Sequence, residues 1–402
     1  MTNDAAMIER IARRRDDLHQ QQAREGRTRH LEVVRPSPMV IPEPRALRRE
    51  PPRAPEDMQA DYLEKFDAKT LFYDAFRVGD DIWLCGPPMR NLKGPVRRRG
   101  SWSLDGRAVD AERLQQRDWV RTQRTRLLDP GPGRDLALDM QGFTMHSQVG
   151  DDGAGLFAGR YTVTTKSSDN DLVWITDWLH YYHEVHGVTG VVLYENNSTR
   201  YRAEDVLEAI AAVPGIEVGI VVDWQFAWGP NGGPHKKWDS DFSQYAMLEH
   251  ARHRYLRDAA GVVNCDIDEL VLTDDGRTVF EHAAEVPSGV LRYRGVFIAK
   301  RTDVPLDPDR QRRFKDYHYR IGGDTTAKWT TIPAHVDLDA TQWRVHNVAG
   351  CEPDMVEDVV HRHYQGVNNG WKYDRRETVA DPDELVRDTD MEAVLDLVFG
   401  DR

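Results

Sequence analysis

The residues best suited to chemistry are two aspartates that follow a short apolar run. Asp266-Ile267-Asp268-Glu269 comes directly after the run 261–264. In an extended segment, residues i and i+2 point to the same side, so the carboxylates of Asp266 and Asp268 can converge on one hard divalent cation. Such an ion stabilises, as a Lewis acid, the negative charge that develops on a departing diphosphate. The alternative is a pair of turn or capping aspartates at a strand end.

Polar side chains also follow two earlier apolar runs, 161–165 and 188–194. Asparagine amides and carboxylates offer donors and acceptors to a nucleobase or a ribose, although a serine at such a position also serves as a helix cap. The candidates are Lys166, Asp169, Glu195, Asn196, Asn197 and Ser198.

For these three clusters to act together, they must lie at the same edge of one sheet. An alternation of strands and helices along the chain predicts such a sheet. Strands are expected at 161–165, 188–194, 216–222 and 261–264, and helices at 171–186, 203–213 and 241–258. Short connections between them are typical of βαβ units, which wind a parallel sheet. Ligands bind outside the carboxyl ends of such strands, where all three clusters lie. The aromatic residues of the first helix, Trp174, Trp178, Tyr181 and Tyr182, are expected in the core rather than in a sugar platform.

The remaining chain is divided by composition. Residues 1–64 contain a charged helical pattern and a proline-rich stretch, which predict a helix and a partly flexible linker. Short apolar runs separated by turn residues predict a small β-rich domain over 65–157. The α/β domain is expected over 158–380, and a C-terminal helix or tail over 381–402.

Composition excludes several classes of protein. The chain has 402 residues, of which 40% are hydrophobic and 30% charged, and its net charge of −13 makes nucleic acid an unlikely partner. No apolar stretch approaches the roughly 20 residues of a membrane span. The N-terminus lacks the features of a secretory signal, which predicts a cytoplasmic protein. Three widely spaced cysteines imply neither a disulfide framework nor a cysteine-based zinc site.

Three motifs, taken in order, resemble a known family. Asp177-Trp178-Leu179-His180-Tyr181-Tyr182 with Tyr194-Glu195-Asn196-Asn197-Ser198-Thr199, then Asp266-Ile267-Asp268-Glu269, then His361-Arg362-His363-Tyr364 are similar to signatures of glycosyltransferase family 92 and its bacterial family-2-like relatives. The resemblance covers about residues 160–376. This sequence differs from the family pattern at two places. Lys166-Ser167-Ser168-Asp169 stands where the family usually has a K-N-E-like motif, and Glu195 stands where aspartate is usual.

The resemblance implies a GT-A fold, which is a Rossmann-like nucleotide-sugar-binding domain with a mostly parallel central sheet. It implies that the first two clusters hold the nucleotide, that Asp266 and Asp268 hold a metal, and that His363, or else His361, completes the metal site. A mixed carboxylate and imidazole shell favours Mn²⁺ over Mg²⁺. Further donor contacts are expected from Asp266, Lys328, Lys372, Arg375 and Arg376, with the last three forming a lid. Lys328 is equally well interpreted as a strand-end lysine.

The implied activity is transfer of a hexose from a nucleotide diphosphate sugar, with UDP favoured, to a glycan, glycoconjugate or small-molecule acceptor with inversion. Inversion needs a carboxylate base, for which Asp324, Glu352 and Asp354 are candidates in polar loops. His346, on an expected strand 343–348, is a core residue or a residue near the acceptor or metal. Two alternatives stay open: a metal-dependent phosphoryl or nucleotidyl enzyme, and a non-catalytic sugar-binding protein with a GT-A-like sheet.

Overall fold

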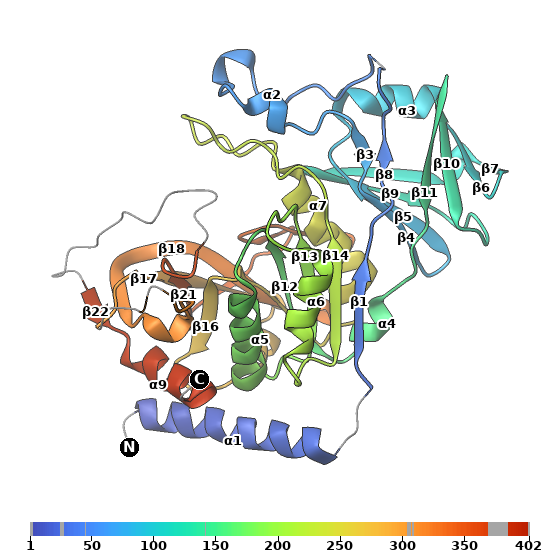
Figure 1. Ribbon diagram of the computed structural model, residues 1–402. Coiled ribbons are helices and arrows are strands. Elements are labelled where there is room, and N and C mark those ends of the chain that lie inside the picture. The colour runs from blue at the N-terminus through green and yellow to red at the C-terminus, as the bar shows by residue number, and fades with distance from the viewer. Residues whose placement is uncertain are drawn as a thin grey trace.

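The computed structural model describes residues 3–24, 28–44, 46–140, 142–303, 307, 309–368 and 385–400 of the chain. A ten-stranded mixed sheet forms the centre of the molecule, and helices cover both of its faces (Figure 1). Its strands are β1 (His30–Val34), β12 (Tyr161–Ser167), β13 (Gly190–Glu195), β14 (Val218–Asp223), β15 (Gly261–Asn264), β16 (Glu269–Thr273), β17 (Val290–Ile298), β18 (Tyr319–Thr331), β21 (Asp354–Tyr364) and β22 (Leu385–Arg387).

One half of the sheet is parallel, with the order β1-β14-β13-β12-β15. The helices between these strands are α5 (Leu172–His186), α6 (Ala203–Ala211) and α7 (Phe242–His250), which continues as a π-helix over Ala251–Leu256. The predicted alternation of strands and helices is therefore confirmed. The chain moves from β12 outward to β14 and then returns to place β15 on the other side of β12. Ligands bind open sheets at such a reversal of strand order.

The other half of the sheet corrects the expectation of a mostly parallel sheet. The pairs β15–β18, β18–β17, β21–β16 and β18–β22 are antiparallel, and β17–β21 is parallel. Parallel strands need a crossover connection, usually a helix, between them. After β15 most neighbouring strands lack such a helix, and β17 pairs antiparallel with β18, which follows it in the sequence. Beyond residue 264, α8 (Val279–Glu285) and α9 (Thr389–Phe399) are the α-helices among the described residues.

The parallel strands are apolar throughout because both faces of the sheet are covered. In β13, Val191 and Leu193 belong to the core shared with α5 and α6, whereas Val192 and Tyr194 face the α7 side. Helix α1 (Asn3–Arg24) and α9 contact α5 and each other along the base of the molecule (Figure 1). The sheet is thus the middle layer of three, and its strand ends are free to carry a site.

Residues 39–148 form smaller antiparallel sheets with an apolar core of their own. Their strands are β2 (Met39–Val40), β3 (Thr70–Phe72), β4 (Asp74–Val78), β5 (Asp81–Gly86), β6 (Ser101–Leu104), β7 (Arg107–Val109), β8 (Leu114–Trp119), β9 (Thr122–Leu127), β10 (Asp135–Met140) and β11 (Phe143–Gln148), with helices α2 (Tyr62–Lys65), α3 (Lys93–Arg99) and α4 (Ala154–Phe157) nearby. Two of the sheets have four strands each, in the orders β4-β5-β9-β8 and β11-β10-β6-β7. The rings of Phe76 and Trp83 contact His250 and His253 on the α7 segment, which connects this part to the main sheet.

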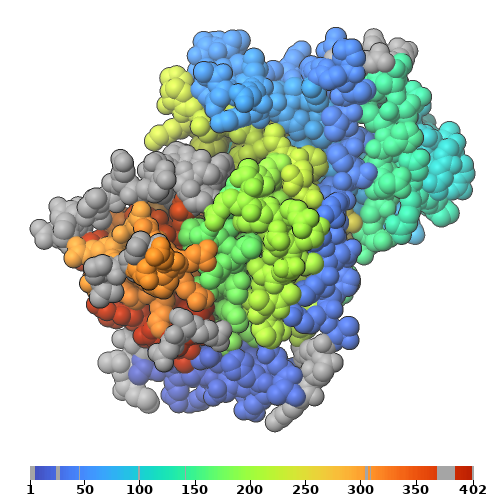
Figure 2. Space-filling view, in the orientation of Figure 1, coloured from blue at the N-terminus to red at the C-terminus, as the bar shows by residue number. Residues whose placement is uncertain are grey.

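The segment 1–64, expected to be a helix and a linker, contains further regular structure, namely β1, β2 and the start of α2. Residues His30–Val34 are not linker but form β1, an edge strand that pairs in parallel with β14. Leu31 and Val33 pack against the main core, which is why this short alternating segment joins the sheet. Figure 2 shows the N-terminal segment in blue, running along the base and then beside the yellow-green part of the molecule.

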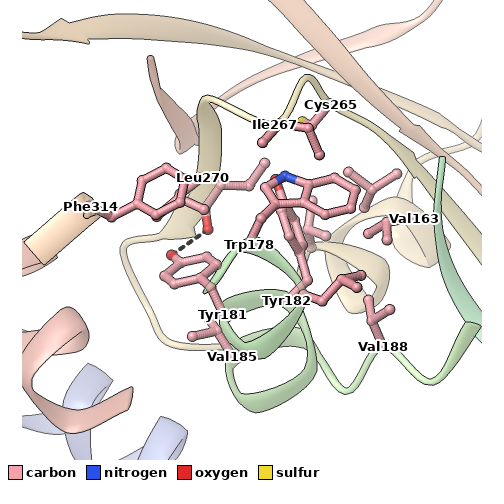
Figure 3. Packing of buried hydrophobic residues seen from close by; sticks show 14 of the residues in the cluster. Val163, Trp178, Tyr181, Tyr182, Val185, Val188, Cys265, Ile267, Leu270 and Phe314 are labelled. Atoms are coloured by element: carbon pink, nitrogen blue, oxygen red, sulfur yellow. Dashed lines mark hydrogen bonds between the residues drawn. The ribbon is translucent and has the colours of Figure 1, made fainter. Parts of the chain in front are cut away.

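The aromatic residues of helix α5 pack beneath the acidic segment Asp266–Glu269. Trp178, Tyr181 and Tyr182 are fully buried and pack beneath the chain at Cys265, Ile267 and Leu270 (Figure 3). This confirms that the aromatic residues of the helix are core residues. Because the helix is rigid and buried, it fixes the chain that carries the aspartates.

Candidate functional site

The acidic segment that follows β15 is a tight turn. The backbone N–H of Glu269 donates to the carbonyl oxygen of Asp266 (3.1 Å), and Oε2 of Glu269 accepts from the N–H of Asp266 (2.9 Å). The prediction assumed an extended segment here, but the chain forms a turn. The carboxylates still converge, since Asp266, Asp268 and Glu269 each offer an oxygen within 4.8 Å of the others. Ile267, between the aspartates, points into the core.

The turn is held from two sides. The hydroxyl of Tyr182 on α5 donates to the carbonyl oxygen of Glu269 (3.2 Å), and that of Tyr181 donates to the carbonyl oxygen of Val271 (2.7 Å). On the other side, the N–H of Tyr364 on β21 donates to the carbonyl oxygen of Asp268 (2.8 Å). Motifs that are far apart in the sequence thus fix one loop.

Lys328 provides the positive charge in this cluster. Its Nζ lies 2.6 Å from Oδ2 of Asp266 and 2.9 Å from Oε2 of Glu269, and the lysine side chain is 1% exposed. Burial alone would lower the pKa of Lys328, but the charges of Asp266 and Glu269 raise it above its ordinary value. Burial also raises the pKa of Glu269, and Lys328 offsets this only in part. Three carboxylates and one ammonium leave an excess of two negative charges, which one divalent cation would neutralise.

Two histidines of β21 face the same carboxylates. Nε2 of His363 lies 3.2 Å from Oδ2 of Asp268, and Nδ1 lies 3.5 Å from Oε1 of Glu269. Nε2 of His361 lies 3.6 Å from the same Glu269 oxygen. Asn368 also donates to Oδ2 of Asp268 (3.3 Å). The structure therefore brings together the residues predicted to bind a metal, Asp266, Asp268 and His363, together with the predicted alternative His361, and adds Glu269.

The polar side chains after β13 form hydrogen bonds within their own loop and with the loop after β14. Glu195 accepts from the N–H of Ser198 (2.8 Å) and from Gln225 (3.1 Å), and burial raises its pKa. The amide of Asn196 donates to the carbonyl oxygens of Trp224 (2.6 Å) and Phe226 (2.8 Å). These side chains hold the loops at the ends of β13 and β14 together.

Asp169 and Asn197 are turn residues of the same region. Both have left-handed backbone conformations, with φ of 52° and 56°. Asp169 accepts from the N–H groups of Thr199 (2.8 Å) and Arg200 (3.0 Å), and its own N–H donates to the Ser198 hydroxyl (2.8 Å). The amide of Asn197 donates to the carbonyl oxygen of Phe226 (2.8 Å). The loops after β12 and β13 thus form one surface beside the acidic turn.

Lys166 is the last residue but one of β12 and lies on the α7 side of this surface. Its Nζ donates to the Ser243 hydroxyl (2.5 Å) and lies 3.7 Å from the ring centre of Trp228. Trp228 also lines a pocket of about 360 Å³ together with Trp238 and Asn231. Indole faces with a polar rim suit the flat face of a base or of a sugar ring.

The three candidate bases do not join the acidic cluster. Asp324 lies within β18 rather than in a loop, is exposed, and pairs with Arg294 (3.1 Å). Asp354 is the first residue of β21, at the opposite end of the strand from His363, and accepts from the Ser288 hydroxyl (2.7 Å). Glu352 is exposed in the loop before this strand. The predicted polar loop at Asp324 is wrong because the Gly322-Gly323 pair is part of a long strand instead of a turn.

His346 is also placed differently from the expectation. It lies in the turn between β19 (Gln342–Trp343) and β20 (Val348–Ala349), and it is exposed, so the core interpretation is wrong. Asn264, at the end of β15, donates to the carbonyl oxygen of Val345 (2.9 Å), and His346 interacts electrostatically with Asp266. His346 therefore lies in the neighbourhood of Asp266, and its role near a metal or an acceptor stays a prediction.

The three predicted lid residues, Lys372, Arg375 and Arg376, lie outside the described residues. Conversely, Glu269 was not among the predicted site residues. It belongs to the acidic motif, and its place directly before an apolar strand was the available signal. Ser243 and Trp228 had no such signal, because only the fold brings them to Lys166.

Comparisons with known proteins give partial structural similarities. No family model matches the chain, and no curated protein matches it significantly. Among solved structures it is similar to TarS 1–349 of S. aureus in complex with UDP, with 18% identity, 37% of this chain and 38% of that chain covered, and a TM-score of 0.25. It is also similar to the galactosyltransferase LgtC in complex with donor and acceptor sugar analogues (14%, 44% and 58%, TM-score 0.24) and to the bifunctional glycosyltransferase WbbM (15%, 37% and 26%, TM-score 0.23). The chain covers less than two thirds of the length of each.

Within the described ranges, every helix is too short or too polar to cross a lipid bilayer.

Proposed function

We propose that the chain is a metal-dependent glycosyltransferase of the GT-A type, similar to family 92. It would transfer a hexose from a nucleotide diphosphate sugar, with UDP favoured, to a glycan, glycoconjugate or small-molecule acceptor with inversion. The observation that carries the proposal is the meeting of Asp266, Asp268 and His363 where the strand order reverses between β12 and β15. Ligands of open α/β sheets bind at this point.

The residues present fit a divalent cation. The carboxylates of Asp266, Asp268 and Glu269 converge, and the cluster has two negative charges in excess. Asp266 and Asp268 would hold Mn²⁺ or Mg²⁺, and Nε2 of His363, 3.2 Å from Oδ2 of Asp268, would orient that carboxylate toward the ion. When bound, the ion neutralises charge on the leaving nucleotide diphosphate. Lys328 keeps Asp266 and Glu269 in place.

The loops at the ends of β12, β13 and β14 would hold the nucleotide. Glu195, Asn196 and Asp169 are engaged in bonds within these loops, so their contribution is to shape the surface. Lys166 lies in the same region beside Trp228. This arrangement supports binding of a base and ribose next to the metal.

A donor-turnover assay tests the proposal. The protein is incubated with a panel of nucleotide sugars and Mn²⁺, and free UDP or GDP is measured. We expect Asp268→Asn to fold and to lose at least about 100-fold of the metal-dependent turnover, because an amide cannot hold the cation that stabilises the leaving group. Asp151→Asn, which changes an exposed aspartate paired with Arg134 outside the cluster, is the matched control.

Each other outcome has a definite meaning. Equal turnover of Asp268→Asn and wild type at saturating Mn²⁺ ends the metal assignment. Release of inorganic phosphate or pyrophosphate, in place of a nucleoside diphosphate, points to a phosphoryl or nucleotidyl enzyme. Absence of turnover with every donor, together with sugar binding, leaves a non-catalytic sugar-binding protein.

A further inference from the structure

His361 is a buried histidine in an unusual position. It is 0% exposed, and neither ring nitrogen has a hydrogen-bond partner among the described residues. Buried polar groups are nearly always satisfied, so an unpartnered imidazole calls for an unseen ligand. Its Nε2 points at Oε1 of Glu269 from 3.6 Å, which is too long for a hydrogen bond.

His363 is oriented toward the same oxygen. Its Nδ1 lies 3.5 Å from Oε1 of Glu269, while Nε2 lies 3.2 Å from Oδ2 of Asp268. A histidine that ligates a metal commonly donates its other ring N–H to a carboxylate, which fixes the tautomer. Nε2–H of His363 toward Asp268 satisfies this pattern and leaves the lone pair of Nδ1 facing Glu269. The hydroxyl of Thr325 is 3.5 Å from Nδ1, a long contact that an ion would replace.

The spacing of these atoms matches a coordination shell. Two ligands at 2.0–2.1 Å from a tetrahedral ion are separated by roughly 3.3–3.4 Å. The observed separations of 3.5 and 3.6 Å are close to this value, and the three ligand atoms lie within 4.8 Å of one another. The two contacts with Oε1 of Glu269 would have to shorten by only a few tenths of an ångström.

The surroundings preserve the space for the His361 ring. Gly295 on β17 pairs with His361, and a Cβ at Gly295 would lie 2.1 Å from Nε2. Only glycine therefore admits the ring at this place. Lys328 contacts the other oxygen of Glu269, Oε2, so Oε1 remains directed at the two imidazoles.

We infer that Glu269, His361 and His363 form a second metal site, on the inner side of the aspartate pair, for a transition-metal ion. Two imidazoles and one carboxylate favour ions such as Co²⁺ or Zn²⁺ over Mg²⁺. The neutral ring of His363 has a single lone pair. It therefore serves the inner ion through Nδ1, and the outer ion of the proposed function keeps Asp266, Asp268 and donor oxygens. The inner site does not depend on the proposed function.

Cobalt binding tests this inference without any use of activity. The full chain is stripped with a chelator and titrated with Co²⁺ in the absence of nucleotide, and the visible d–d absorption and the metal content are measured. We expect one tightly bound ion per chain with the strong band of a four- or five-coordinate site, and weaker binding at the aspartate pair only at higher Co²⁺. His361→Gln should weaken binding at least about tenfold, since even loss of an outer-shell partner has this effect. His146→Gln, which removes an exposed histidine on β11 outside the cluster, should leave binding unchanged.

The contrary results are equally clear. The inference is overturned if stripped wild type binds no Co²⁺, or if folded His361→Gln binds it as tightly as wild type. It is also overturned if Asp266→Asn abolishes binding while His361→Gln does not, because the ion then belongs to the aspartate pair. Should His361→Gln fail to fold, pulsed EPR of wild type with one equivalent of Cu²⁺ counts the ligating imidazoles. Two are expected, and fewer than two would refute the site.

Discussion

Replacing Lys328 by methionine measures how much the lysine's positive charge contributes to the stability of the folded protein. Methionine has a similar length but no charge, so Asp266 and Glu269 lose an ammonium at 2.6 and 2.9 Å. The Glu269 side chain is 2% exposed, which leaves its carboxylate buried without a counter-charge. Loss of one partner of a buried ion pair costs about 3–5 kcal/mol, and we expect this decrease in the free energy of unfolding in urea at neutral pH. Circular dichroism follows the transition.

The pH dependence of this deficit has a defined sign. The pKa of Glu269 is raised in the folded protein by burial, so folding takes up a proton and stability falls as the pH rises through the ordinary value of about 4.3. Without Lys328 the pKa rises further. The difference between variant and wild type should therefore be largest at neutral pH and should narrow toward about pH 4.5. Added Mn²⁺ should raise the stability of the variant more than that of wild type.

A surface lysine provides the control for this experiment. Lys315 pairs with Asp396 (3.2 Å) near the surface, and Lys315→Met should cost at most about 1 kcal/mol. If Lys328→Met costs no more than Lys315→Met, or if its deficit is constant across this pH range, the reasoning on buried charge is refuted.

Three further predictions concern the elements that support the site. Asn196→Ala removes two hydrogen bonds to the loop 224–226 and should lower the free energy of unfolding by about 1–3 kcal/mol; an unchanged urea midpoint would contradict this. Burial lowers the pKa of His186 from 6.5 to about 3, so stability should be lost as the pH falls through that interval, and less so in a His186→Gln variant. Gly295→Ala should destabilise by about 1–3 kcal/mol in thermal melts because it displaces the ring above it, whereas Gly322→Ala, with open space around it, should not.

The parallel half of the sheet could be predicted because its signals are local. Apolar runs such as β13, each followed by a helix with a clear pattern, identify elements without knowledge of their partners. The buried aromatic face of α5 follows from the same reasoning. The candidate metal residues Asp266 and Asp268 were found because they follow an apolar strand directly.

The rest depends on contacts between distant segments, which leave little trace in local sequence. Lys328 lies 62 residues from Asp266, and no local pattern distinguishes a strand-end lysine from a buried ion-pair partner. Asp324 and Asp354 looked like loop residues because glycine and proline surround them, yet they lie in long strands that pair across the sheet. Edge strand β1 was not predicted because the sequence that follows it is rich in proline. In each case tertiary pairing overrode a local signal.

The aromatic helix connects these observations into one physical account of the site. A turn with three carboxylates repels itself, so it stays compact only if its backbone is held independently of its side chains. Tyr182 binds the carbonyl of Glu269, and the N–H of Tyr364 binds the carbonyl of Asp268, so both anchors act on the main chain. The side chains are then free to face a cation, with Lys328 limiting the repulsion until one binds. Tyr181 and Tyr182 of α5 therefore support the backbone of the acidic turn from below.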